Sequence, residues 1–193
     1  MEKRDKNFFK SISIVLLSLV AFLLIIAIFI KVDNYKTRSY KIDVFFKSDD
    51  IVVLTNKLPI SEDIGKNYTG VGVEKGIVEY KEFTISNPND RKVSYEIYLT
   101  KISNSTDDIR SNYIRLYLTD EENNPIEGFG TKKGKTYYDL YSFNNQPGSK
   151  LLYTGTLVSG GTKKFILRSW VDDTYVLSEK AEDFTFDIGA RIK

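Results

Sequence analysis

Residues 79–99 read EYKEFTISNPNDRKVSYEIYL, and this stretch decides the fold. Its second half alternates, and one face carries the apolar side chains Val93, Tyr95, Ile97 and Leu99. Because successive side chains of a strand point to opposite faces, this period of two predicts a half-buried β-strand. Residues 87–90, Asn-Pro-Asn-Asp, are a strong turn signal that ends the preceding apolar run. The stretch therefore predicts two strands joined by a turn.

The same pattern recurs over most of the chain outward from this point. Residues 151–158 and 164–171 flank Ser-Gly-Gly-Thr and predict the clearest hairpin. One short helix is predicted near residues 61–66, with Ser61 as its N-cap. About eight or nine strands with regular turn signals predict an all-β domain, an antiparallel immunoglobulin-like β-sandwich over residues 41–193. The further strands are expected at residues 42–46, 51–55, 77–85, 113–118, 137–143 and 184–192.

A different kind of segment precedes this domain. Residues 11–30 read SISIVLLSLVAFLLIIAIFI and contain no charged side chain. At ~1.5 Å per residue, such a helix spans roughly 30 Å, which is the thickness of the hydrocarbon core of a bilayer. The exit sequence AIFIKVD lacks the small residues of a cleavage site, which favours an uncleaved signal anchor over a cleaved signal peptide. The sequence therefore predicts contact with the lipid bilayer through residues 11–30.

The orientation of this predicted single-pass anchor does not follow from charge, because basic residues flank it on both sides. Long domains are translocated largely regardless of their charge, and a ten-residue tail is easily retained. We therefore expect residues 1–10 to be a cytoplasmic tail, residues 31–40 a short connector, and residues 41–193 an extracytoplasmic domain at the cell membrane.

Composition excludes several classes of function. The chain has no cysteine and no histidine, which removes disulfides, thiolate nucleophiles, imidazole catalysis and Cys/His zinc sites. Residues 1–50 carry 9 of the 28 basic and 6 of the 26 acidic side chains, which leaves 19 and 20 for the rest. A nearly neutral domain has no field to attract phosphates, so nucleic acid is not an expected partner. A Cys-free chain rich in Lys, Ile, Asn and Tyr is typical of a surface protein of a Gram-positive bacterium.

Two stretches carry a resemblance to a known family. Residues 79–99, quoted above, and residues 151–173, LLYTGTLVSGGTKKFILRSWVDD, resemble bacterial cell-surface sandwiches of the TasA and camelysin kind. The resemblance covers about 45 residues and implies a β-sandwich at the cell surface. The absence of a cleavage site departs from a released fibre subunit of that family, and no functional residue is carried over.

Four acidic dipeptides are candidates for a catalytic pair, since two carboxylates can hydrolyse a glycosidic bond. They stand at residues 49–50, 107–108, 121–122 and 172–173. Each lies in a predicted turn, where an aspartate initiates the turn and stays solvated. No phosphate loop, nucleophile elbow or metal-ligand spacing is present in the sequence. We therefore do not expect an enzyme, although a wall-acting hydrolase is kept as an alternative.

An oxygen-rich segment at residues 120–124 has the texture of a calcium loop. Its candidate ligands are Asp120, Glu122 and Asn124, but the glycine and distal bidentate glutamate of the EF-hand pattern are missing. An ordinary polar turn is the simpler interpretation, and no cofactor is predicted.

The densest aromatic cluster is the predicted partner surface. Tyrosine is favoured on strands for packing alone, but Tyr137 and Tyr138 must face opposite ways, so at least one ring is expected to be exposed. Tyr141 and Asn144 extend the surface, in keeping with the enrichment of tyrosine at interfaces. Trp170, the single tryptophan, is expected to be a core anchor on the same face as Ile166 and Arg168.

These features together favour a membrane-anchored cell-surface binding or structural module that contacts another membrane or surface protein near the bilayer. Self-association is left open as a further contact. The alternative is a secreted fibre or matrix subunit, which requires removal of the chain up to about Ala27.

Overall fold

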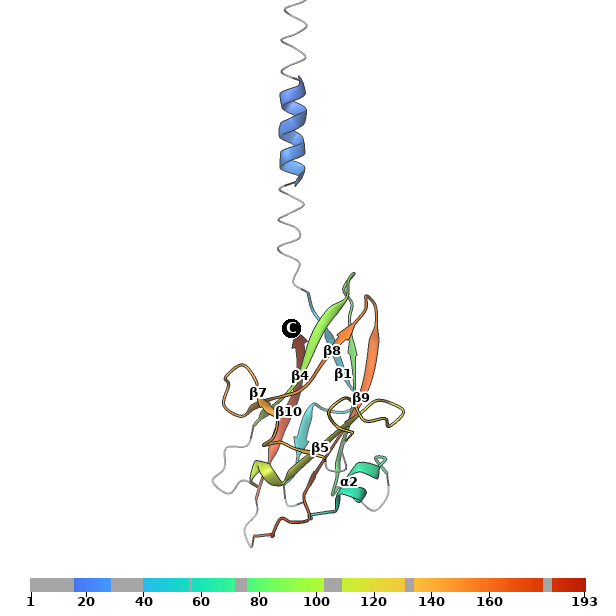
Figure 1. The fold of residues 1–193 in the computed structure, drawn as a ribbon, viewed down its shortest axis with the longest axis vertical. Coiled ribbons are helices and arrows are strands. Elements are labelled where there is room, and N and C mark those ends of the chain that lie inside the picture. Colours follow the sequence, from blue (N-terminus) through green and yellow to red (C-terminus); the bar gives the residue numbers. More distant parts are fainter. Residues whose placement is uncertain are drawn as a thin grey trace, which may run out of the picture. The chain divides into compact units, whose positions relative to one another are not determined.

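The computed structural model describes residues 16–28, 40–55, 57–71, 76–102, 109–130, 134–178 and 182–193. The chain divides into two compact units, Met1–Tyr40 and Lys41–Lys193, and each is described by itself. In the first unit residues 16–28 are helical (Figure 1). None of the helices described is both long and apolar enough to cross a membrane. The ends of the predicted anchor, residues 11–15 and 29–30, lie outside the described residues.

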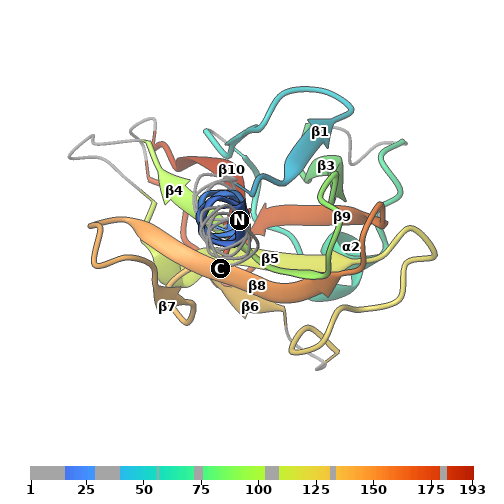
Figure 2. The same cartoon turned by 90° about the horizontal axis from the view of Figure 1, so that it is seen from above.

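The second unit is a sandwich of two antiparallel five-stranded sheets, which confirms the predicted β-sandwich (Figures 1 and 2). The first sheet has the order β1-β3-β9-β5-β6 and the second has the order β2-β10-β4-β8-β7. The strands are β1 (Asp43–Phe46), β2 (Ile51–Val53), β3 (Glu79–Ser86), β4 (Val93–Lys101), β5 (Ile114–Thr119), β6 (Lys135–Thr136), β7 (Tyr141–Ser142), β8 (Ser149–Leu157), β9 (Thr162–Val171) and β10 (Thr185–Ile192). The short helices are α2 (Glu62–Asn67) and the 3-10 turn η1 (Ser111–Tyr113).

The strand order is not the immunoglobulin order that the strand spacing predicted. The chain pairs as a nested ribbon, in which β5 joins β6, β4 joins β8, β3 joins β9 and β2 joins β10. Successive pairs of this ribbon lie in opposite sheets. That arrangement is a jelly roll with β1 added beside β3 and β7 added beside β8, whereas immunoglobulin sheets place several consecutive strands side by side.

The predicted hairpin of residues 151–171 is consequently wrong. Its two arms are β8 and β9, which belong to different sheets, so the Gly160 turn is an arch across the core. The β3–β4 turn is an arch of the same kind. Alternation in the sequence identifies which face of each strand is buried, but an arch and a hairpin present the same alternation.

One buried asparagine links the two arches. The side chain of Asn87 is fully buried, and its amide nitrogen donates to the carbonyl oxygens of Arg91 at 2.8 Å and Val158 at 2.8 Å. Its backbone N–H donates to Gly161 and its carbonyl accepts from Gly160. The predicted Asn-Pro-Asn-Asp turn is therefore confirmed, and its first residue also positions the second arch.

The main core fills the space between the sheets. Phe83, Tyr95 and Phe165 are buried there, and Phe165 contacts both of the other two rings. A second, smaller cluster lies on the outer face of the first sheet, where Trp170 packs with Ile60, Tyr68 and Val78. Trp170 is thus fully buried as expected, but beneath the segment that contains α2 instead of between the sheets.

Helix α2 confirms the predicted helix near residues 61–66. Ser61 occupies the N-cap position, but its side chain makes no capping hydrogen bond, and only its carbonyl accepts from Gly65 at 3.1 Å. The helix lies at the end of the sandwich opposite the C-terminal end of β10 (Figure 1). Its contact with β9 covers part of the outer face of the first sheet.

Candidate interaction surface on the outer face of the first sheet

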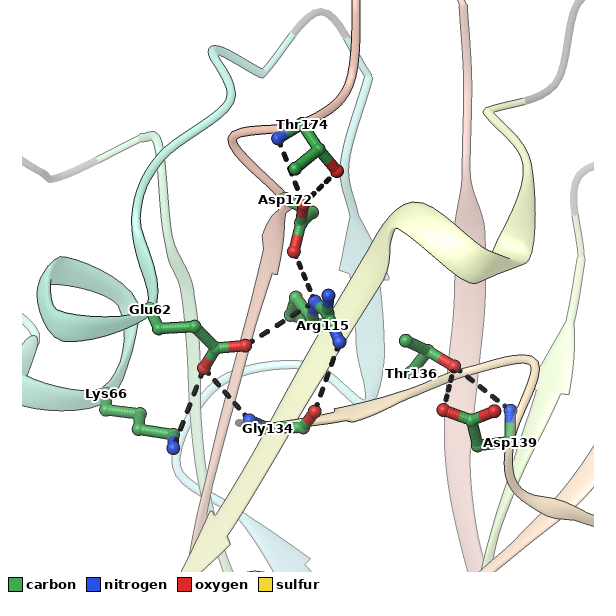
Figure 3. A network of polar contacts seen from close by, with 8 residues as sticks. All are labelled: Glu62, Lys66, Arg115, Gly134, Thr136, Asp139, Asp172 and Thr174. Carbon is green, nitrogen blue, oxygen red and sulfur yellow. Dashed lines mark hydrogen bonds and ion pairs between the residues drawn. The ribbon is translucent and has the colours of Figure 1, made fainter. Parts of the chain in front are cut away.

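An ion network fixes α2 to the first sheet (Figure 3). Arg115 on β5 pairs through Nε with Asp172, just after β9, and with Glu62 of α2 at 3.5 Å. Glu62 also accepts the backbone N–H of Gly134 at 2.9 Å, and Arg115 donates to the Gly134 carbonyl at 3.3 Å. One arginine therefore joins the helix, two strands and the segment that leads into β6.

Asp172 is the most buried carboxylate of this network, with 5% of its side chain exposed. Burial acts to raise the pKa of Asp172, but hydrogen bonds from Thr174 and from Arg115 act against it and hold the pKa below its ordinary value. The carboxylate is therefore charged at neutral pH and already engaged by its neighbours. The arrangement stabilises the packing of α2 on the sheet.

A second arginine, Arg168 on β9, is buried on the same face with only 1% exposure. It donates to the Tyr68 carbonyl, to the hydroxyl of Thr119 at 3.1 Å and to the side-chain oxygen of Asn123. Its guanidinium also lies 5.2 Å from the centre of the Tyr80 ring. Every one of these partners is neutral, and burial lowers the pKa of Arg168. Arginine nevertheless keeps its charge at neutral pH.

A pocket of about 550 Å³ lies next to the residues that surround this arginine, although Arg168 itself is buried and does not line it. Two of the residues that contact the guanidinium, Tyr80 and Asn123, line the pocket, as does Ile166, two positions before Arg168 on β9. Phe45, which is 60% exposed, adds an aromatic wall from β1. The volume is within the range of pockets that hold small ligands or an anchoring side chain.

Two ion pairs cross the lining of this pocket. Lys47 pairs with Glu82 at 3.0 Å, and Lys164 pairs with Glu121 at 2.7 Å. All four side chains are at least one third exposed, so solvent screens these pairs and their contribution to stability is small. In charge they cancel, whereas Arg168 beside the pocket has no acidic partner among the residues that the structure describes.

The predicted tyrosine surface lies elsewhere, around β7 of the second sheet. Tyr138 and Tyr141 are exposed, with 67% and 80% of their surface accessible, and Asn144 is exposed beside them. Tyr137 does not belong to this surface, because it is buried in the main core against Phe184. This burial raises the pKa of Tyr137. Of the strand predicted at residues 137–143, only residues 141–142 form a strand, β7, and residues 137–140 form the turn between β6 and β7.

Asn144 has a specific partner. Its side-chain oxygen accepts from Arg191 at 2.7 Å, and Arg191 also pairs with Glu96 at 3.0 Å and lies 4.2 Å from the centre of the Phe143 ring. The amide is thus held by β10 of its own chain.

The candidate calcium ligands form a self-contained turn after β5. One oxygen of Asp120 accepts the backbone N–H groups of Glu122 and Asn124, and the other accepts the side-chain amide of Asn124 at 3.1 Å. Across the residues that the structure describes, no group of three acidic side chains could hold a metal ion. Asp120, Glu122 and Asn124 therefore belong to a hydrogen-bonded turn, in which Asn123 has a positive φ of 66°.

The acidic dipeptides are distributed around the sandwich. Asp49 pairs with Lys81, which lowers the pKa of Asp49, Glu121 pairs with Lys164, and Asp172 pairs with Arg115. The pair at residues 107–108 lies outside the described residues.

The site at Arg168 was not recognised from the sequence. One signal was present, since a charged residue stands between Ile166 and Trp170 on one face of an apolar strand. Such a residue is either a salt-bridge member or a buried cation, and only the fold distinguishes the two.

Comparison with protein-family models found none that matches this chain, and a search among curated proteins returned no significant match.

Proposed function

We propose that this chain is a membrane-anchored surface module that binds another protein through the outer face of its first sheet. The pocket between β1, β3 and β9 carries this proposal. It combines an exposed aromatic ring, Phe45, with charged side chains at its rim and a buried cation beside it. Such a combination of an apolar contact with a few polar groups is typical of sites that bind an anchoring group.

The uncharged segment at residues 11–30 supports the membrane anchor, with residues 1–10 inside the cell and the sandwich outside. The ten-residue connector reaches at most about 35 Å when fully extended. Lys41, where the connector ends, exchanges two hydrogen bonds with Asn89 of the β3–β4 arch. The partner would therefore be a membrane or surface protein within that reach of the bilayer.

Photo-crosslinking in cells tests this proposal. A photoreactive phenylalanine analogue at Phe45 should give a covalent adduct with one protein partner, because this side chain is exposed at the pocket. Tyr141 is the matched control, since it is also an exposed aromatic side chain but lies on the second sheet. An adduct from Tyr141 alone would place the partner on the predicted tyrosine surface instead. No adduct from either position would overturn the binding-module function.

A further inference from the structure

We infer that the pocket accepts an acidic side chain of the protein partner, with Arg168 as its counter-charge. This inference rests on the proposed function and specifies the chemistry of the partner. It follows from an imbalance of charge on the outer face of the first sheet.

Arg168 is almost completely buried, and its charge has no ionised partner among the described residues. Arginine is rarely buried to 99% without an ionised partner, because a desolvated charge is costly unless it is paired. Within the described residues no aspartate or glutamate pairs with Arg168, and its hydrogen bonds go to a carbonyl, a hydroxyl and an amide oxygen. Arg115, on the neighbouring strand, has the usual environment of a buried arginine, since it pairs with two carboxylates.

The hydrogen-bonding capacity of Arg168 is also incompletely used. A guanidinium has five N–H donors in a planar fork that matches a carboxylate. Three of them are accounted for by Tyr68, Thr119 and Asn123. A carboxylate therefore offers both the missing charge and additional acceptor oxygens.

Asn123 is the residue that both lines the pocket and bonds to Arg168. This residue is exposed, lines the pocket and carries no charge, and its oxygen meets the Nη2 atom of Arg168. It lies in the segment after β5 with a positive φ of 66°. A carboxylate that entered the pocket could replace the neutral oxygen of Asn123 by an ionised one on the same nitrogen, which forms a stronger, charge-assisted hydrogen bond.

The acidic residues already at the rim do not fill this role. Glu82 and Glu121 pair with Lys47 and Lys164, so each is matched by its own cation. The partner group must therefore come from outside the described part of the chain.

The test uses the purified full-length protein in detergent micelles and follows the Arg168 side-chain Nε–H signal by NMR. The probes are the capped peptide acetyl-Gly-Asp-Gly-amide and its matched neutral form acetyl-Gly-Asn-Gly-amide. We expect a saturable shift of the Arg168 signal with the aspartate peptide, and binding of the neutral peptide weaker by about tenfold or more. Equal shifts with both peptides would overturn the inference.

A variant supplies the carboxylate within the chain. Asn123→Asp places one beside Arg168 at a position where aspartate tolerates a positive φ. We expect this variant to unfold at a higher urea concentration and to lose the shift caused by the aspartate peptide. Asn145→Asp is the control, because Asn145 is also exposed and has a positive φ of 54°. A less stable Asn123→Asp protein that still responds to the peptide would contradict the inference.

A titration with inorganic phosphate distinguishes a site for a protein carboxylate from a site for a small free anion. A shift with phosphate but not with the aspartate peptide would indicate a small-anion site and overturn the proposed partner chemistry. A Phe45 adduct in cells without any acid-dependent shift would overturn this inference alone. An acid-dependent shift without any adduct would overturn the proposed function and leave the carboxylate site standing.

Discussion

Gly65 of α2 lies directly against the indole of Trp170, so closely that a Cβ atom at position 65 would come within 2.4 Å of ring carbons Cδ2 and Cε2. This contact lets the helix approach the sheet and seal the outer cluster. It explains why a glycine, which weakens a helix, stands in the middle of one.

Gly65→Ala should therefore destabilise the sandwich even though alanine is the better helix former. The added methyl group must displace either the helix or the buried indole, and such overpacking typically costs about 1–3 kcal/mol. Urea unfolding followed by Trp170 fluorescence measures the loss. Gly130→Ala is the control, because a Cβ there meets only Pro125, at 3.8 Å. Equal stability of Gly65→Ala and the wild type would show that the helix does not pack as described.

Asn87→Asp should destabilise the protein strongly at neutral pH, although the two side chains have nearly the same shape. The substitution replaces the amide donor by a carboxylate that faces the carbonyls of Arg91 and Val158 in a buried site. Each buried carbonyl left without a donor costs ~1–3 kcal/mol. We expect a lower midpoint of thermal unfolding, with the exposed Asn145→Asp variant close to the wild type. A small effect would mean that the arches are held by other contacts.

Asp172→Asn should reduce stability at pH 7 by ~1.5–3 kcal/mol, the range for a hydrogen bond to a charged group. The free energy of unfolding of this variant should also depend less on pH in the acid range than that of the wild type. The pKa of Asp172 is lowered in the folded state, so its contribution is present above the unfolded pKa near 3.8 and is lost as the pH falls through the folded pKa. Unfolding between pH 2 and pH 7 measures both effects. Asp173→Asn, at the exposed neighbouring position, should keep the wild-type profile; a profile of Asp172→Asn parallel to that of the wild type would contradict the assignment.

Leu23→Arg should impair membrane insertion, because an arginine near the centre of a span costs ~2.5–3.5 kcal/mol on the insertion scale. Leu23 lies within the helical residues 16–28. We expect the variant to be extracted by alkaline carbonate and the Leu23→Ile control to remain with the membrane. If the arginine variant resists extraction, residues 11–30 do not act as a span.

Protease added to intact cells tests the orientation. If the sandwich lies outside, cleavage should occur at once at the lysine pair of residues 132–133, in a predicted exposed loop that lies outside the described residues. Mass spectrometry of the untreated protein should find Met1 or its immediate successor as the N-terminus, as an uncleaved anchor requires. A protected domain would reverse the orientation, and an N-terminus near Ala27 would favour the secreted fibre subunit.

Local sequence predicts the elements well, because alternation and turn residues act within a few positions. The strand expected at residues 93–99 is found as β4 at Val93–Lys101, and the helix expected near residues 61–66 is found as α2 at Glu62–Asn67. Residues 137–140, at the start of a predicted strand, are an exception. Their aromatic side chains have the composition that is typical of a strand, but Tyr137 is buried and donates its hydroxyl to the Gly148 carbonyl at 2.6 Å.

The sequence by itself determined where most of the strands lie, and that the chain has no cysteine or histidine chemistry. Tertiary structure alone decided which strands pair, because β8 has the same alternation whether it joins β9 or β4. It also decided the candidate site, since Arg168 and Asn123 stand 45 positions apart and meet only when β9 lies beside β5. Hydrogen bonding between distant strands, and the burial that follows from it, depends on the whole fold, whereas alternation is a property of each segment.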